Sequence, residues 1–197
     1  MARPSLDPAV RMIGDLPTWA GPSFSLVIVV RVDRDGVIAL FDYNYWADRH
    51  LLDVAAKLTP AAWRANSDVT TRGLRATLVH ALDVERSWRL RLQKRPKAEW
   101  DAELDPASYD DPTTLADEWR RDEAEMRAWL STLDQVALDA EWNDGGRDRF
   151  PLWFFLVHVI THSQQQRSDA AILLTRIGHS PGDIDFLNYV DSASTAR

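Results

Sequence analysis

Two histidines and a glutamine recur at four-residue intervals near the carboxyl-terminal end of this 197-residue chain. They are His158, His162 and Gln166, within residues 151–177, where apolar side chains recur with helical spacing. Four residues advance a helix by about 6 Å and return to the same face, so two neighbours in this series could bind one ion. His80, in a second helical segment, is the one good candidate for a ligand from another helix. The pattern predicts a metal site between helices, and the alternative is a buried polar network that holds the helices in register.

Other polar residues interrupt the apolar faces of the predicted helices. Asn44 and Glu85 lie on the apolar lines of the first and second helical segments, and Asp169 lies on the line of His162. A polar group buried without a partner costs several kcal/mol, so each of these residues needs one. We predict Glu85 and Asp169 as proton acceptors beside the metal, with a buried network again as the alternative. Arg167 is predicted as a surface or interface residue, because it points about 140° away from His162 on a helical wheel.

Four segments with helical periodicity carry these residues, at about 37–58, 71–93, 112–133 and 151–177. Stretches rich in proline, glycine and aspartate separate them. The connection over residues 95–111 is long and irregular enough to cross a bundle. The sequence therefore predicts an all-α fold, a four-helix bundle with a long crossover between its second and third helices.

The ends of the chain carry different signals. Residues 24–32 have the composition of a strand, but no second segment alternates in a way that would pair with it. The tail over residues 178–186 contains two glycines, a proline and two aspartates, which predicts a structured turn with Phe186 and Tyr189 packed back on the bundle. The predicted organisation has three parts: an N-terminal extension over residues 1–35, the bundle over residues 36–190 and a tail over residues 191–197.

Composition and charge narrow the possible functions. Hydrophobic residues make up 45% of the chain and charged residues 27%, as in globular domains, and no apolar run approaches the roughly 18 residues of a membrane span. The 30 acidic and 23 basic residues leave a net charge of −7, which opposes nucleic-acid binding. The chain has no cysteine, so thiol chemistry requires the sulfur of a substrate. No secretory signal is visible, and we expect a cytoplasmic protein without a membrane partner.

Four stretches of the chain, taken in order, resemble the DinB family. They are FDYNYWA at 41–47, HALDVERSW at 80–88, HVITHSQQQR at 158–167 and GHSPGD at 178–183. The likeness runs from about residue 36 to residue 189. It implies a four-helix bundle, often a homodimer, that holds a divalent metal cation, zinc or nickel, between its helices.

The resemblance also implies a set of metal ligands, with one histidine on the second helix and two on the fourth at positions i and i+4. These positions fall on His80, His162 and Gln166. Glutamine departs from the family pattern, and its neutral carbonyl oxygen binds zinc or nickel more weakly than an imidazole does. Three outcomes stay open: a metal held by these three residues, a metal held with His158 in place of Gln166, and a site without metal.

The activity implied by the resemblance is that of a metal-dependent transferase. In this reaction a low-molecular-weight thiol, such as mycothiol or bacillithiol, binds the metal and attacks an electrophile as the thiolate. A hydrolase-like reaction needs much the same residues. The alternative is a non-catalytic, stress-related bundle or binding protein with a degenerate metal site, and Gln166 is the residue that favours it.

Overall fold

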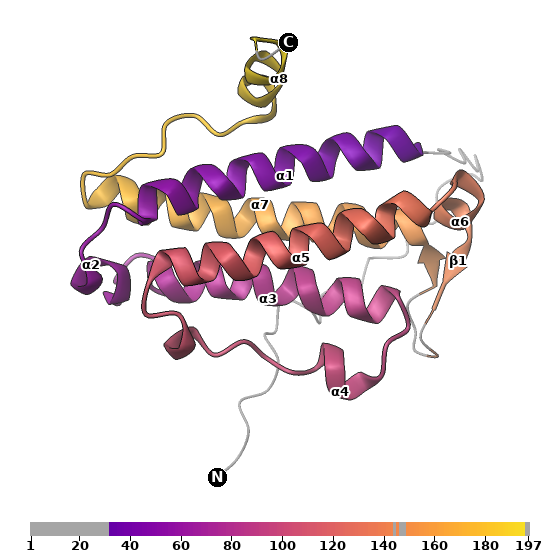
Figure 1. Ribbon diagram of the computed structural model, residues 1–197, viewed down its shortest axis with the longest axis horizontal. Helices are drawn as coiled ribbons and strands as arrows, with labels where there is room; N and C mark the ends of the chain where they lie inside the picture. The colour runs from indigo at the N-terminus through magenta and orange to yellow at the C-terminus, as the bar shows by residue number, and fades with distance from the viewer. Residues whose placement is uncertain (1–31, 144, 146–148, 196–197) are drawn as a thin grey trace, which may run out of the picture. The chain divides into compact units, whose positions relative to one another are not determined.

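The computed structural model describes residues 32–143, 145 and 149–195, which belong to one compact unit of the chain. Its four long helices are α1 (Arg34–Ala55), α3 (Leu74–Leu92), α5 (Pro112–Thr132) and α7 (Leu152–Arg176). They run side by side (Figure 1), and α1 and α3 each pack against both α5 and α7. The predicted all-α four-helix bundle is therefore confirmed, and each long helix corresponds to one predicted segment.

Short elements connect the long helices and extend the bundle. They are α2 (Pro60–Arg64), α4 (Lys97–Trp100), the 3-10 helix η2 (Pro106–Ser108), α6 (Gln135–Asp139), β1 (Glu141–Trp142), β2 (Phe150–Pro151) and α8 (Phe186–Thr195). The two strands pair antiparallel, with Glu141 opposite Pro151. The connection between α3 and α5 contains α4 and η2, and it is the long crossover predicted between the second and third helices.

Side-chain caps determine where two of the long helices begin. The Asp33 side chain accepts a hydrogen bond from the Gly36 N–H at 2.7 Å, so α1 begins before the predicted residue 37. The Asp111 side chain accepts one from the Thr113 N–H at 2.7 Å and caps α5 in the same way. Pro112 occupies the first turn of α5, where its missing N–H costs no helical hydrogen bond.

The core of the bundle is filled by apolar side chains from all four long helices. Four that are fully buried, one from each, are Phe41, Leu78, Leu115 and Leu156. Trp63 of α2 is also fully buried, and its indole N–H donates a hydrogen bond to the Tyr109 carbonyl at 2.8 Å. Because this core excludes water, any polar group inside it needs a partner from the protein or from a ligand.

The tail behaves as the sequence predicts. Irregular backbone follows α7 and leads into α8, which lies on α1 (Figure 1). Phe186 meets Tyr43 edge to face, with ring centroids 5.4 Å apart, and Tyr189 lies 5.8 Å from Trp46. The predicted packing of Phe186 and Tyr189 onto the bundle is confirmed.

The possible strand over residues 24–32 falls, except for Val32, outside the described residues. The division into an extension over residues 1–35, a bundle and a tail stays a prediction. None of the helices described is both long enough and apolar enough to cross a membrane.

Candidate metal site

The structure brings His80 of α3 and His162 of α7 together across the helix pair. Their ring centroids are 5.4 Å apart, and the rings meet edge to face. Both side chains are half-buried. Two imidazoles bound to one tetrahedral ion, with bonds of about 2.0–2.1 Å, have centroids roughly 5 Å apart. The observed separation therefore suits two imidazole ligands of a single ion.

The electrostatic surroundings of His162 keep its ring neutral. Burial first, and then His80, His158 and Arg72, each of which would repel a positive ring, together lower the pKa of His162 to about 4. Its Nδ1 atom is buried and has no hydrogen-bond partner among the described residues. A neutral imidazole at pH 7 with an unpartnered nitrogen is in the state that binds a metal ion.

Gln166 lies one turn after His162 on α7 and is 5% exposed. Its Oε1 atom is buried and finds no hydrogen-bond partner within the part of the chain that the structure describes. Ser163 adds a third buried atom of this kind, its Oγ, in the same turn of the helix. Unsatisfied buried polar atoms are rare, so three in one turn of α7 indicate a place where an ion or water binds.

His158 lies one turn before His162, and its side chain is exposed. Its ring centroid is 6.3 Å from that of His162 and 5.2 Å from that of Trp88, which it meets edge to face. Loss of hydration lowers the pKa of His158 below its ordinary value. His80, His162 and His158 therefore form a row of three rings, and Trp88 of α3 lies at the His158 end of this row.

The donor set of this site includes an amide. Across the described ranges, no group of three His, Cys, Asp or Glu side chains is arranged to hold a metal ion. Gln166 belongs to another residue type, and its amide oxygen is a donor for zinc or nickel, although weaker than imidazole. The buried atoms of His162 and Gln166 and the nearby ring of His80 thus fit a divalent cation.

The two predicted proton acceptors occupy different surroundings. Glu85 is fully buried, and its carboxylate accepts hydrogen bonds from the Tyr45 hydroxyl at 2.5 Å and the Asn44 amide at 3.1 Å. Asp169 is half-buried on α7, three residues beyond Gln166, and makes no hydrogen bond or ion pair with any described residue. Of these two acidic residues, Asp169 is therefore the one without a partner in the described structure.

The free energy of unfolding is expected to fall as the pH rises from about 4.5 to about 8. Burial, followed by the charges of Asp48 and Asp122, raises the pKa of Glu85 from 4.5 to about 8. In this range the folded chain keeps a proton that the unfolded chain has released, which costs up to about 1.4 kcal/mol per pH unit. The pKa of Asp48, raised to about 6 mainly by burial, acts in the same direction.

Glu85→Gln tests this pH dependence, because glutamine stays neutral at every pH. Urea unfolding between about pH 5.5 and about pH 8.5 should give a flatter stability profile for this variant than for the unchanged protein, by about 3 kcal/mol over the range. Glu103→Gln, at an exposed position, is the control and should keep the original slope. Parallel profiles for Glu85→Gln and the unchanged protein would show that Glu85 is ionised in the folded state throughout.

Arg167 is the position where the sequence-based prediction is wrong. The helical wheel predicts it on the surface or at an interface, but its side chain is 1% exposed and lies inside the bundle. The guanidinium donates to the Asn44 side-chain oxygen, to Asp48 of α1 at 3.3 Å and to Gln164 at 3.2 Å. The wheel fails because α7 packs against α1 as well as α3, and a long side chain on its flank reaches the second helix.

A second buried ion pair lies between α3 and α5. Arg89 contacts Asp122, and each side chain is 4% exposed. Arg89 also pairs with Glu125 at 2.8 Å. Asp122 shares the buried face of α5 with Trp119 and Met126. Arg89 comes four residues after Glu85 on α3. This spacing between an arginine and another buried polar residue is the signal that the sequence-based prediction did not use.

The tail contains Gly178-His179-Ser180-Pro181-Gly182, which has the spacing of a serine-nucleophile motif. That motif acts at a sharp turn between a strand and a helix. Here it follows helix α7, and the exposed Ser180 hydroxyl accepts a hydrogen bond from the Gly182 N–H at 3.2 Å. This backbone context does not build a nucleophile elbow.

Comparison with known proteins agrees with the geometry of the bundle. Residues 32–197 match the family model described as DinB family. The match covers all four long helices and α8. No curated protein matches the chain.

Proposed function

Because this chain belongs to the DinB family, we propose that it binds a divalent metal ion between α3 and α7 through His80, His162 and Gln166. The observation that carries this proposal is the pair of buried, unpartnered atoms one turn apart, Nδ1 of His162 and Oε1 of Gln166. An ion between them and the ring of His80 would satisfy both atoms. The bound ion is zinc or nickel, because two imidazoles and an amide oxygen suit these borderline cations.

The proposed reaction is a transfer to a low-molecular-weight thiol. A bound divalent cation supplies charge that lowers the pKa of a coordinated thiol, so the thiolate forms near neutral pH. Three protein ligands leave open positions for that thiol, as in catalytic rather than structural metal sites. The chain itself has no cysteine, so its own residues do not compete for the ion through sulfur.

The side chains around the histidine pair have separate roles in this proposal. The carboxylate of Asp169 accepts the proton that the thiol releases, since it is the acidic group on α7 without a partner in the described structure. The rings of His158 and Trp88 extend from His162 and provide a surface for the electrophile. Glu85 holds the core network through Tyr45 and Asn44 instead of contacting the thiol.

A non-catalytic binding bundle is the second candidate function. It is favoured by the absence, among the described residues, of three His, Cys, Asp or Glu side chains placed around one ion. With Gln166 in a ligand position, affinity for metal would be lower than with a third histidine. For either function, we also propose that the chain forms a homodimer, on the basis of the family resemblance.

Measuring the affinity of the protein for zinc distinguishes these two candidate functions. The protein should bind about one zinc ion per chain, and Gln166→His should tighten binding at least about tenfold, because imidazole is the stronger ligand. Competition with a chromophoric chelator measures both affinities. Gln165→His, at the exposed neighbouring position, is the matched control and should leave the affinity unchanged.

Two results would contradict the proposal. If Gln166→His and Gln165→His had the same affinity as the unchanged protein, the side chain at position 166 would lie outside the coordination shell. If the protein bound none of Zn²⁺, Ni²⁺ and Mn²⁺, the metal-dependent reaction would be rejected and the non-catalytic bundle favoured.

A further inference from the structure

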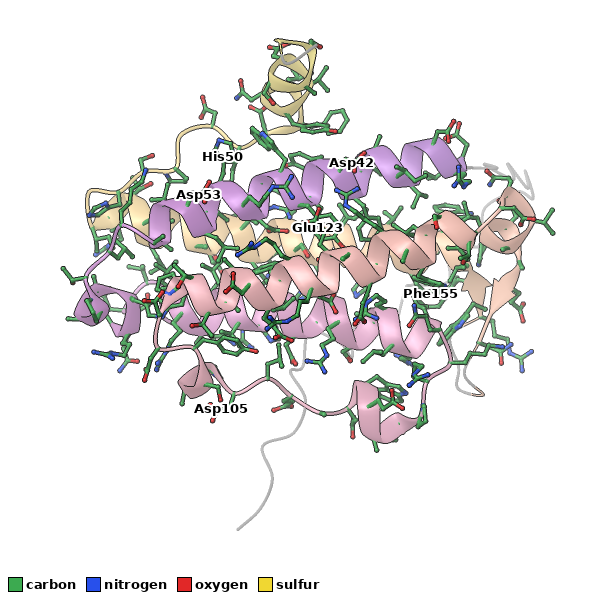
Figure 2. The ribbon with its side chains drawn as sticks, viewed as in Figure 1. Asp42, His50, Asp53, Asp105, Glu123 and Phe155 are labelled. Atoms are coloured by element: carbon green, nitrogen blue, oxygen red, sulfur yellow. The ribbon has the colours of Figure 1, made fainter. Side chains whose placement is uncertain are left out.

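A partly enclosed cavity of about 260 Å³ lies between α1 and α5. Its lining residues come from these two helices and from Ala56, which directly follows α1. Asp53 of α1 and Glu123 of α5, labelled in Figure 2 along the seam between the two helices, are among them. Because α3 and α7 contribute nothing to its lining, the cavity is separate from the candidate metal site.

The walls of this cavity are largely apolar and aromatic. The apolar lining residues are Leu52, Ala56, Pro112 and Ala116. Tyr45 and Trp119, both buried, add two aromatic rings. The indole Nε1 of Trp119 is buried and has no hydrogen-bond partner in the described structure. A buried donor without a partner costs about 1–3 kcal/mol, which an acceptor atom on a ligand would recover.

The positive charges at this cavity already have partners. Arg49 donates to both carboxylate oxygens of Glu123, at 2.9 and 3.1 Å. Arg120 contacts Asp117. The carboxylate of Asp53 is exposed and forms no ion pair with another described residue. The charge left for a ligand is therefore negative, which favours a cation over an anion.

We propose that the cavity between α1 and α5 binds a small organic amine, with its ammonium group against Asp53 and its apolar body against Trp119 and Tyr45. Aromatic rings attract ammonium ions through their negative faces, and a carboxylate adds direct charge pairing. The apolar walls bury the rest of the ligand, as in pockets for small molecules.

The first test uses 2-phenylethylamine as the probe in isothermal titration calorimetry with the full chain. The expected result is saturable binding that is at least about tenfold tighter than that of 2-phenylethanol, which has the same ring and no charge. Asp53→Asn should weaken amine binding about three- to fivefold. Asp35→Asn makes the same charge change on α1 at a side chain that is 93% exposed and outside the cavity, and it should have no effect.

A second variant tests the location. Ala116→Phe puts a ring into the cavity and should abolish amine binding without changing zinc affinity, because the metal site lies on other helices. Circular dichroism checks that this variant is folded. If it is not folded, the comparison of Asp53→Asn with Asp35→Asn decides the test. The proposal is overturned by any of four results: no binding of 2-phenylethylamine, equal binding of 2-phenylethanol, equal affinity in Asp53→Asn and Asp35→Asn, or amine binding retained in folded Ala116→Phe.

Discussion

His162→Ala is expected to lower the affinity of the protein for Zn²⁺ by at least about 100-fold, because changes in groups that merely support a ligand already cost 10–100-fold. The His162 ring is central to the row formed with His80 and His158. Its pKa of about 4 means that no proton has to be displaced at neutral pH. Elemental analysis after dialysis, followed by chelator competition, measures the loss.

Two histidine variants serve as comparisons. His179→Ala, in the exposed tail, should retain the original affinity. His158→Ala distinguishes the two possible ligand sets, since a small effect assigns the third position to Gln166 and a loss as large as that of His162→Ala assigns it to His158. Zinc affinity that is unchanged in folded His162→Ala would contradict a metal site between α3 and α7.

Arg167→Met is expected to lower the free energy of unfolding by about 3–5 kcal/mol at pH 7.5 or so. The change leaves the buried Asp48 carboxylate without its cation and the Asn44 side-chain oxygen without its donor. Both partners in the ion pair are nearly inaccessible, at 1% and 2% exposure, so water cannot replace the guanidinium. Urea unfolding followed by circular dichroism gives the difference.

At acidic pH, Arg167→Met should lower the free energy of unfolding by less. The pKa of Asp48 is raised to about 6 mainly by burial, and Arg167 opposes that rise. Without Arg167 the carboxyl takes up a proton more readily, so the penalty of Arg167→Met should shrink as the pH falls below about 6.

A surface ion pair provides the matched control. Arg49→Met removes one of two arginine partners of Glu123, since Arg127 also pairs with it at 2.8 Å. The Arg49 side chain is 49% exposed, so this change should cost less than about 1 kcal/mol. If Arg167→Met cost no more than this, the buried guanidinium would not hold α7 against α1. The double variant Arg167→Met with Asp48→Leu should recover much of the lost stability, because it removes both buried charges together.

The sequence alone predicted the four long helices of this protein and named His80 and His162 as candidate ligands on two of them. Helical periodicity depends on local spacing, so the four segments, the crossover and the turn before Phe186 could be read without coordinates. The spacing of His162 and Gln166 likewise follows from helix geometry. The ends of the long helices shifted, as at α1, where the side chain of Asp33 decides the first turn. The short helices between them, α8 and the strand pair were not predicted.

Tertiary structure decided which polar residues share an environment. A helical wheel gives the direction of a side chain from its own axis, but it holds no information on how many helices pack around that axis or how far a long side chain reaches. Arg167 is therefore buried against α1, and Glu85 bonds to Tyr45 in the core instead of facing the histidines. The cavity beside Asp53 has the same origin, because it exists only where the surfaces of α1 and α5 leave space between them.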